Sequence, residues 1–202
     1  MSPMWNNKLN ALALHIPKNA GTSIGMALGT VDGFQGLIGK IGFDTIHATL
    51  DEIVRDHNIT PKHVFVCLRD PYTRFVSIFL ACVQLGFLAD YDTTLDGCLQ
   101  FIDDIQQGRI GSNEVIRFLK PQCEYISDIE GCSIHFGFVD TIYDDLNAWT
   151  SKIGKVVLQV PFANVQEHID CHLWSENTTV RTFVESYYAN DFMLLSQIQG
   201  MC

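Results

Sequence analysis

The 202-residue sequence predicts a single α/β domain, covering residues 1–202, with a mainly parallel central sheet. Short β-type runs alternate along the chain with helical patterns, which is typical of this fold class. The β-type runs are nearly continuous in apolar residues, as expected for strands that are covered on both faces. They comprise residues 10–16, 63–68, 133–139 and 155–160.

Helical patterns fill the intervals between these runs. Residues 49–52 (TLDE) have the form of a capping box and predict the start of a helix. Residues 94–107 place apolar side chains on one stripe with acidic residues opposite. Residues 75–89 form the longest apolar stretch, which at 15 residues is too short to cross a bilayer and predicts a buried core helix. Further helices are expected at residues 140–152 and 179–199.

Composition and charge exclude some functions. With 47% hydrophobic and 18% charged residues the chain is globular, and its net charge of −10 argues against general nucleic-acid binding. Residues 1–80 hold seven basic and six acidic side chains, whereas residues 81–202 hold six and 17. The first residues lack the pattern of a secretory signal, and the seven cysteines lie mostly in apolar settings. We therefore expect a cytoplasmic protein with reduced thiols and no transmembrane segment.

A candidate anion site lies in residues 12–26, LALHIPKNAGTSIGM, where an apolar strand is followed by a short turn and a helix. Such a unit presents backbone amides and the positive helix end to an anion. Gly21 allows close approach, Thr22 and Ser23 add hydroxyls, and Lys18 adds a positive charge. Lys18 precedes the glycine, so the segment is not a Walker A loop. A plain strand–turn–helix with a surface lysine fits the spacing equally well.

The second motif is residues 64–80, VFVCLRDPYTRFVSIFL. Arg69 follows the apolar run, at the carboxyl end of a predicted strand, where open α/β sheets bind ligands. Ser77 is a polar residue in an apolar helix and needs a partner if it is buried. Cys67 and Arg74 are one residue too far apart for the C-x5-R signature of tyrosine phosphatases.

Together, HIPKNAGTSI and LRDPYTRFVSIF resemble the two cofactor-binding signatures of sulfotransferases that use 3′-phosphoadenosine 5′-phosphosulfate (PAPS). They are most similar to the carbohydrate-type branch, which includes heparan sulfate 2-O-sulfotransferases and small bacterial members. Weaker similarity extends to residues 118–122, 139–146 and 188–192. The resemblance implies a P-loop-like α/β fold, with helices flanking the sheet, and aromatic residues in 188–192 that pack the last helix on the sheet.

The resemblance also implies roles for individual residues. Lys18 would contact the leaving phosphate, and Arg69 and Ser77 would hold the 3′-phosphate. Arg74 matches a family arginine, although an ion-pair or surface role fits it equally. The reaction would transfer a sulfuryl group to a hydroxyl of a carbohydrate or small molecule, without a metal. The 5′-phosphosulfate would be held by the first loop, namely Lys18, Asn19, Ala20, Gly21, Thr22 and Ser23.

Sulfuryl transfer to a hydroxyl also needs a general base. His47, in DTIHATLDE, lies between the two motifs in a segment that resembles the family stretch with a base-like histidine. A packing or capping role is its alternative. We expect His15 to pack along its strand and His135 to lie in the core. His168 and His172 have a spacing that could bind a metal, but no second group of ligands supports such a site.

Two other functions fit parts of the sequence. A nucleotide-dependent kinase could use the first loop, although the Walker lysine and a clear metal-binding carboxylate are missing. A binding module could keep the PAPS site without a working base. Arg117 and Lys120 could contact an anionic acceptor, but a solvated helix face is the preferred interpretation. The acidic residues 81–202 favour a neutral or weakly charged acceptor over a long polyanion such as heparan sulfate.

Overall fold

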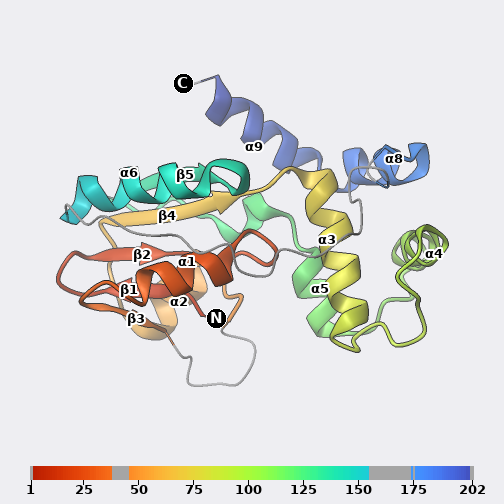
Figure 1. Cartoon of the computed structure of the whole chain (residues 1–202), viewed down its shortest axis with the longest axis horizontal. Coiled ribbons are helices and arrows are strands. Elements are labelled where there is room, and N and C mark those ends of the chain that lie inside the picture. The colour runs from red at the N-terminus through yellow and green to blue at the C-terminus, as the bar shows by residue number, and fades with distance from the viewer. Residues whose placement is uncertain (1, 38–45, 155–173, 175, 201–202) are drawn as a thin grey trace. The chain divides into compact units, whose positions relative to one another are not determined.

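The computed structural model describes residues 2–37, 46–154, 174 and 176–200 (Figure 1). The contacts of the chain divide it into two compact units. The first unit comprises Met1–Arg69 and Glu124–Gln166, and the second comprises Asp70–Cys123 and Glu167–Cys202. The strand predicted at residues 155–160 and the histidines His168 and His172 lie outside the described residues.

The first unit is built on a sheet with the strand order β3-β1-β2-β4-β5. At its centre, β2 pairs in parallel with β4, and β4 pairs in parallel with β5. At one edge, β1 pairs antiparallel with both β2 and β3. The strands are β1 (Met4–Asn6), β2 (Ala11–Ala13), β3 (Phe34–Gly36), β4 (His63–Leu68) and β5 (Ser133–Phe138).

The two-residue period of the strands explains how this sheet is buried. Ala11, Ala13, Phe65 and Cys67 alternate along β2 and β4 and belong to one apolar cluster. The residues between them, such as Val64, are also fully buried. Both faces of the parallel centre are therefore covered, which is why these segments read as continuous apolar runs.

Three α-helices accompany the described strands of the first unit: α1 (Gly21–Leu28), α2 (Leu50–His57) and α6 (Ile142–Gly154). Apolar side chains of α1 and α6 join the cluster with Phe65, so these two helices pack on the same face of the sheet. The predicted capping box begins α2, because the Thr49 hydroxyl accepts from the Glu52 amide and the Glu52 carboxylate accepts from the Thr49 amide. A 3-10 turn, η3 (Val139–Thr141), precedes α6.

The second unit is helical in its described residues, and four of its helices begin with a polar cap. Asp70, Thr94, Ser112 and Asn177 each accept a hydrogen bond from an amide in the first turn of the helix that follows. The helices are α3 (Pro71–Gln84), α4 (Leu95–Gln106), α5 (Asn113–Leu119), α8 (Thr178–Tyr187) and α9 (Ala189–Gln199). The 3-10 helix η2 (Gln122–Tyr125) follows α5 where the chain leaves this unit.

The core of the second unit forms around α3, the helix predicted from the apolar stretch. Phe75 stacks at 6.1 Å from Phe101 of α4 and lies 5.1 Å from Phe183 of α8, measured between ring centroids. Most of α3 is buried, which confirms the prediction of a core helix, although the helix ends at Gln84 and residues 85–89 of the predicted stretch lie in a turn. Among the described residues, no helix combines the length and the apolar character that a membrane crossing requires.

Several predictions are refined by the structure. The parallel pairing of the central strands is confirmed, but the antiparallel edge formed by β1 and β3 was not predicted. The helix expected at residues 179–199 is two helices, α8 and α9, separated at Tyr188. Tyr188 and Phe192 pack against Phe75 and Tyr72 of α3 within the second unit, and their packing on the sheet stays a prediction.

Candidate functional site

The loop after β2 has an unusual backbone. Lys18 and Ala20 both adopt left-handed conformations, with φ values of 65° and 58°. Ala20 is the N-cap of α1 and supplies no side-chain acceptor for the first amides of the helix. Left-handed residues in a loop can gather successive amides into an anion-binding concavity, and a helix start adds its positive dipole end. The local geometry therefore suits a phosphate or a sulfate.

Residues from the second motif hold this loop in place. The Asn19 side-chain amide donates to the buried carbonyl oxygen of Cys67 over 2.8 Å. The Arg69 guanidinium donates through Nη1 to the carbonyl oxygen of Lys18 over 3.2 Å. These contacts bridge about fifty residues of sequence and bring the end of β4 to the loop. The guanidinium of Arg69 therefore lies at the backbone of Lys18 in the first unit.

His47 reaches the same region through His15. The two imidazole rings are in edge-to-face contact, with centroids 4.7 Å apart. His15 is buried against the start of α1, because a Cβ atom on Gly21 would lie only 1.9 Å from its Cδ2 atom. His47 itself lies two residues before Thr49, the N-cap of α2. The candidate base, the loop and the first residue of α1 are thus linked by direct contacts.

The predicted hydroxyl groups are divided between the two units. Thr22 and Ser23 lie in the first turn of α1, at the candidate anion site. Ser77 is the seventh residue of α3 in the second unit, where it is buried with 2% of its surface exposed. The structure therefore brings Lys18, Asn19, Ala20, Gly21, Thr22, Ser23, His47 and Arg69 together in the first unit, whereas a nucleotide-binding role for Ser77 stays a prediction.

The environment of Cys67 is unsuited to thiolate chemistry. Its pKa is raised above the usual thiol value, first by burial and then by the nearby Asp145 carboxylate. This agrees with the exclusion of a phosphatase mechanism from the motif spacing. Within the described part of the chain, no group of three or more histidine, cysteine or acidic side chains could hold a metal ion.

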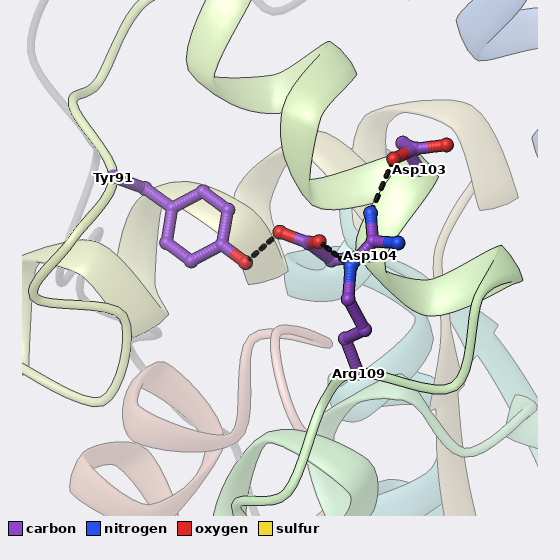
Figure 2. Close-up of polar contacts among 4 residues, drawn as sticks. All are labelled: Tyr91, Asp103, Asp104 and Arg109. Carbon is purple, nitrogen blue, oxygen red and sulfur yellow. Dashed lines mark hydrogen bonds and ion pairs between the residues drawn. The ribbon is translucent and has the colours of Figure 1, made fainter.

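Another group of charges lies outside the candidate site, at the end of α4 in the second unit. Figure 2 shows Arg109 paired with Asp103 and Asp104, and the Tyr91 hydroxyl donating to Asp104. The hydrogen bonds from Tyr91 and Arg109 hold the pKa of Asp104 below its usual value, and burial raises the pKa of Tyr91 to about 12. These side chains satisfy one another and close the turn after α4, so we interpret the group as structural.

Arg74 and Asp191 fix the segment that follows α5. Arg74 is fully buried and donates through Nη2 to the carbonyl oxygens of Phe118 and Lys120. The buried Asp191 carboxylate accepts from the backbone amides of Gln122 and Cys123, each over 2.9 Å. The surface role considered for Arg74 is therefore wrong, and its buried guanidinium holds backbone carbonyls.

Comparison with known proteins identifies the family. The sequence profile of the sulfotransferase family matches residues 4–109, just over half of the chain. The chain belongs to the sulfotransferase family. The matched residues of this sulfotransferase-family protein include both motifs and His47, and α3 and α4 as well. Comparisons with curated proteins and with solved structures find no match.

The sequence did not predict every residue that shapes this sulfotransferase-family site. His15 was expected only to pack, yet it joins Gly21 to His47. The bond from Asn19 to the Cys67 carbonyl was not foreseen, because it depends on tertiary placement. The sequence signal available for His15 and Asn19 was their position alone, since both residues lie close to Lys18 within the first motif. His135, expected in the core, is half-buried on β5.

Proposed function

We propose that this protein transfers a sulfuryl group from PAPS to a hydroxyl of a carbohydrate or small molecule. The observation that carries the proposal is the hydrogen bond from Arg69 to the Lys18 carbonyl oxygen. It places the cation of the second motif at the loop of the first motif, in a chain of the sulfotransferase family. The left-handed loop and the start of α1 fit the 5′-phosphosulfate of such a donor.

In the proposed reaction the acceptor oxygen forms a bond to sulfur while the bond from sulfur to the bridging phosphate oxygen breaks. The phosphate leaves with the electron pair, as part of 3′-phosphoadenosine 5′-phosphate, and the acceptor proton passes to His47. Lys18 stabilises the charge that develops on the leaving oxygen. Residues 18–23 hold the 5′ end, and Arg69 holds the 3′-phosphate. As in phosphoryl transfer, positioning and charge stabilisation supply the catalysis.

Nucleotide binding tests this proposal directly. Isothermal titration calorimetry should show binding of 3′-phosphoadenosine 5′-phosphate, with ATP and AMP bound much more weakly. The 3′-phosphate makes this difference because it is the group that Arg69 is proposed to hold. Equal affinities for the 3′-phosphorylated nucleotide and ATP would instead favour a kinase. Binding without transfer from sulfur-35-labelled PAPS to a panel of glycans and small alcohols would favour a binding module.

The Arg69→Ala variant tests the assignment of the 3′-phosphate site. Loss of a charged hydrogen bond should weaken 3′-phosphoadenosine 5′-phosphate about 10- to 100-fold. AMP affinity should fall much less, because AMP loses no direct contact and only the bond from Arg69 to the Lys18 carbonyl oxygen is removed from the loop. Arg55→Ala is the matched control, because Arg55 is an exposed cation of the first unit and pairs with the neighbouring Asp56. An equal loss of affinity for both nucleotides in Arg69→Ala would contradict the assignment.

A further inference from the structure

His15 is held rigidly by the backbone on both sides. The amide of Leu14 donates to the Phe65 carbonyl oxygen over 2.9 Å, which extends the pairing of β2 with β4 by one residue. The carbonyl oxygen of Ile16 accepts from the Asn19 amide over 3.3 Å, and Leu14 and Ile16 are both buried. The backbone at His15 is therefore fixed between the end of the sheet and the turn that begins the loop.

The side chain of His15 is fixed as well. Its Cδ2 and Nε2 atoms would lie 1.9 and 2.1 Å from a Cβ atom on Gly21, so the ring occupies the space that any larger residue would need. Only 8% of His15 is exposed. The ring cannot swing toward α1 and has little room toward solvent, so it keeps one orientation.

His47 is in a different situation. It lies in the irregular segment before α2, and its nearest anchored neighbours are the buried Ala48 and the N-cap Thr49. Its ring meets the ring of His15 with a centroid separation of 4.7 Å and an interplanar angle of 64°, which is a favourable edge-to-face arrangement. The ring of His47, in an irregular segment, thus packs against the ring of His15, which is fixed at the end of the sheet.

We propose that His15 is a positioning residue, which holds the imidazole of His47 in the orientation that removes the acceptor proton. This role rests on the proposed function, because His47 is the base of that reaction. A general base must come within about 2.6–3.2 Å of the group whose proton it takes, and a misplacement of about 1 Å can lower the rate about 100-fold. A fixed neighbouring ring restricts the side-chain rotamers of His47 and so reduces such misplacement.

The experiment compares His15→Ala with His15→Phe in the full chain. His15→Ala should lower kcat for sulfuryl transfer from PAPS to a mixture of neutral oligosaccharides about 10- to 100-fold, with unchanged affinity for 3′-phosphoadenosine 5′-phosphate by calorimetry. His15→Phe keeps an aromatic ring of similar size and should restore most of kcat. In a His47→Ala background, His15→Ala should cause no further loss, because the base it positions is already absent.

Proton NMR of the imidazole rings gives a readout that does not depend on an acceptor. The ring signals of His47 are assigned by their absence from His47→Ala. In His15→Ala they should narrow and shift toward the positions of a free histidine, because the neighbouring ring is lost. In His15→Phe, which keeps a ring there, they should stay displaced from those positions. His63→Ala is the matched control. His63 belongs to a second histidine pair of the first unit, with its ring 6.1 Å from that of His135, and its loss should change neither kcat nor the His47 signals.

The outcomes separate the two proposals. A wild-type chain that binds no 3′-phosphoadenosine 5′-phosphate would remove the proposed function and the role of His15 with it. Wild-type binding and transfer, combined with unchanged kcat and unchanged His47 signals in His15→Ala, would overturn the role of His15 alone. If circular dichroism shows that His15→Ala is unfolded, His15→Phe decides. A folded His15→Phe whose His47 ring signals stay displaced and whose kcat is near normal supports the positioning role. A folded His15→Phe that has lost both the displacement of the His47 signals and kcat overturns it.

Discussion

Lys18 combines a backbone conformation that disfavours lysine with a position where a positive charge is useful. Its φ of 65° lies in the left-handed region, which costs a non-glycine residue about 1–2 kcal/mol. Such strain persists where the surrounding structure imposes it, and it is found most often at functional sites. The Lys18 carbonyl oxygen is held by Arg69, which is one of the contacts that imposes it.

Lys18→Gly should therefore lower activity strongly without a large loss of stability. Glycine relieves the left-handed strain, and this gain offsets its larger unfolded-state entropy, so urea unfolding should give a free energy within about 1 kcal/mol of wild type or above it. Sulfuryl transfer should fall about 100- to 1,000-fold, because the charge on the leaving phosphate is no longer stabilised. Ala20→Gly, at φ 58°, is the control that relieves strain without removing a charge. A Lys18→Gly variant that keeps its turnover would show that the lysine is structural.

At the scale of single elements, local signals in the sequence were sufficient to predict some helices and strands, whereas other elements have no such signal. The start of α2 and the bounds of β4 follow from local patterns, namely the capping box and a continuous apolar run. The strands β1 and β3 have three residues each, too few to show a two-residue period. The break at Tyr188 has no glycine or proline signal. Asp191, three residues later, accepts long-range bonds from the amides of Gln122 and Cys123, which no local pattern predicts.

The same distinction applies to the candidate site. The loop and Arg69 were identified because a strand end followed by a helix start is a local pattern that favours anion binding. The contact of His47 with His15 joins residues 32 positions apart, and no local pattern encodes such a pair. Sequence therefore predicted which segments form the candidate site, whereas the tertiary structure was needed to show that His47 contacts His15.

The buried contacts of Arg74 between α3 and the segment after α5 lead to a prediction for stability. Arg74→Ala removes the donors for the carbonyl oxygens of Phe118 and Lys120 and the cation–π contact with Tyr188, at 5.7 Å. Unsatisfied buried acceptors should reduce the free energy of unfolding by about 2–5 kcal/mol, measured in urea by circular dichroism. Arg74→Lys should recover little of this, because an ammonium cannot reproduce the planar fork of a guanidinium.

Arg181→Ala is the matched control for this measurement. Arg181 is an exposed arginine of the same unit that also lies over an aromatic ring, 4.5 Å from the centroid of Tyr72, and pairs with Glu185. Because exposed ion pairs are weak, its loss should lower the free energy of unfolding by about 1 kcal/mol or less. Equal effects of the two substitutions would contradict the special role of the buried guanidinium.

For the molecule as a whole, charge distribution bears on the choice of acceptor. The chain carries a net charge of −10, and the acidic excess lies in residues 81–202, whereas Lys18 and Arg69 belong to the nearly neutral first 80 residues. Short-range contacts at the loop can hold an anionic nucleotide despite this net charge, because screening removes most of the repulsion beyond about 8–10 Å at physiological salt. A long polyanionic acceptor extends farther across the acidic surface and is repelled over more of its length.

Turnover at saturating PAPS should therefore depend on salt in a way that reveals the acceptor class. At low ionic strength, kcat/KM for a neutral oligosaccharide should exceed that for its sulfated counterpart. Raising the ionic strength from 0.01 to 0.15 M shortens the screening length from about 30 to about 8 Å and should raise the value for the sulfated acceptor alone. If kcat/KM for the sulfated acceptor instead falls as the salt concentration rises, cations such as Arg117 and Lys120 attract this acceptor locally. Arg117→Ala would then abolish that fall. This result would reverse the interpretation of these two residues as a solvated helix face and make them part of an anionic acceptor site.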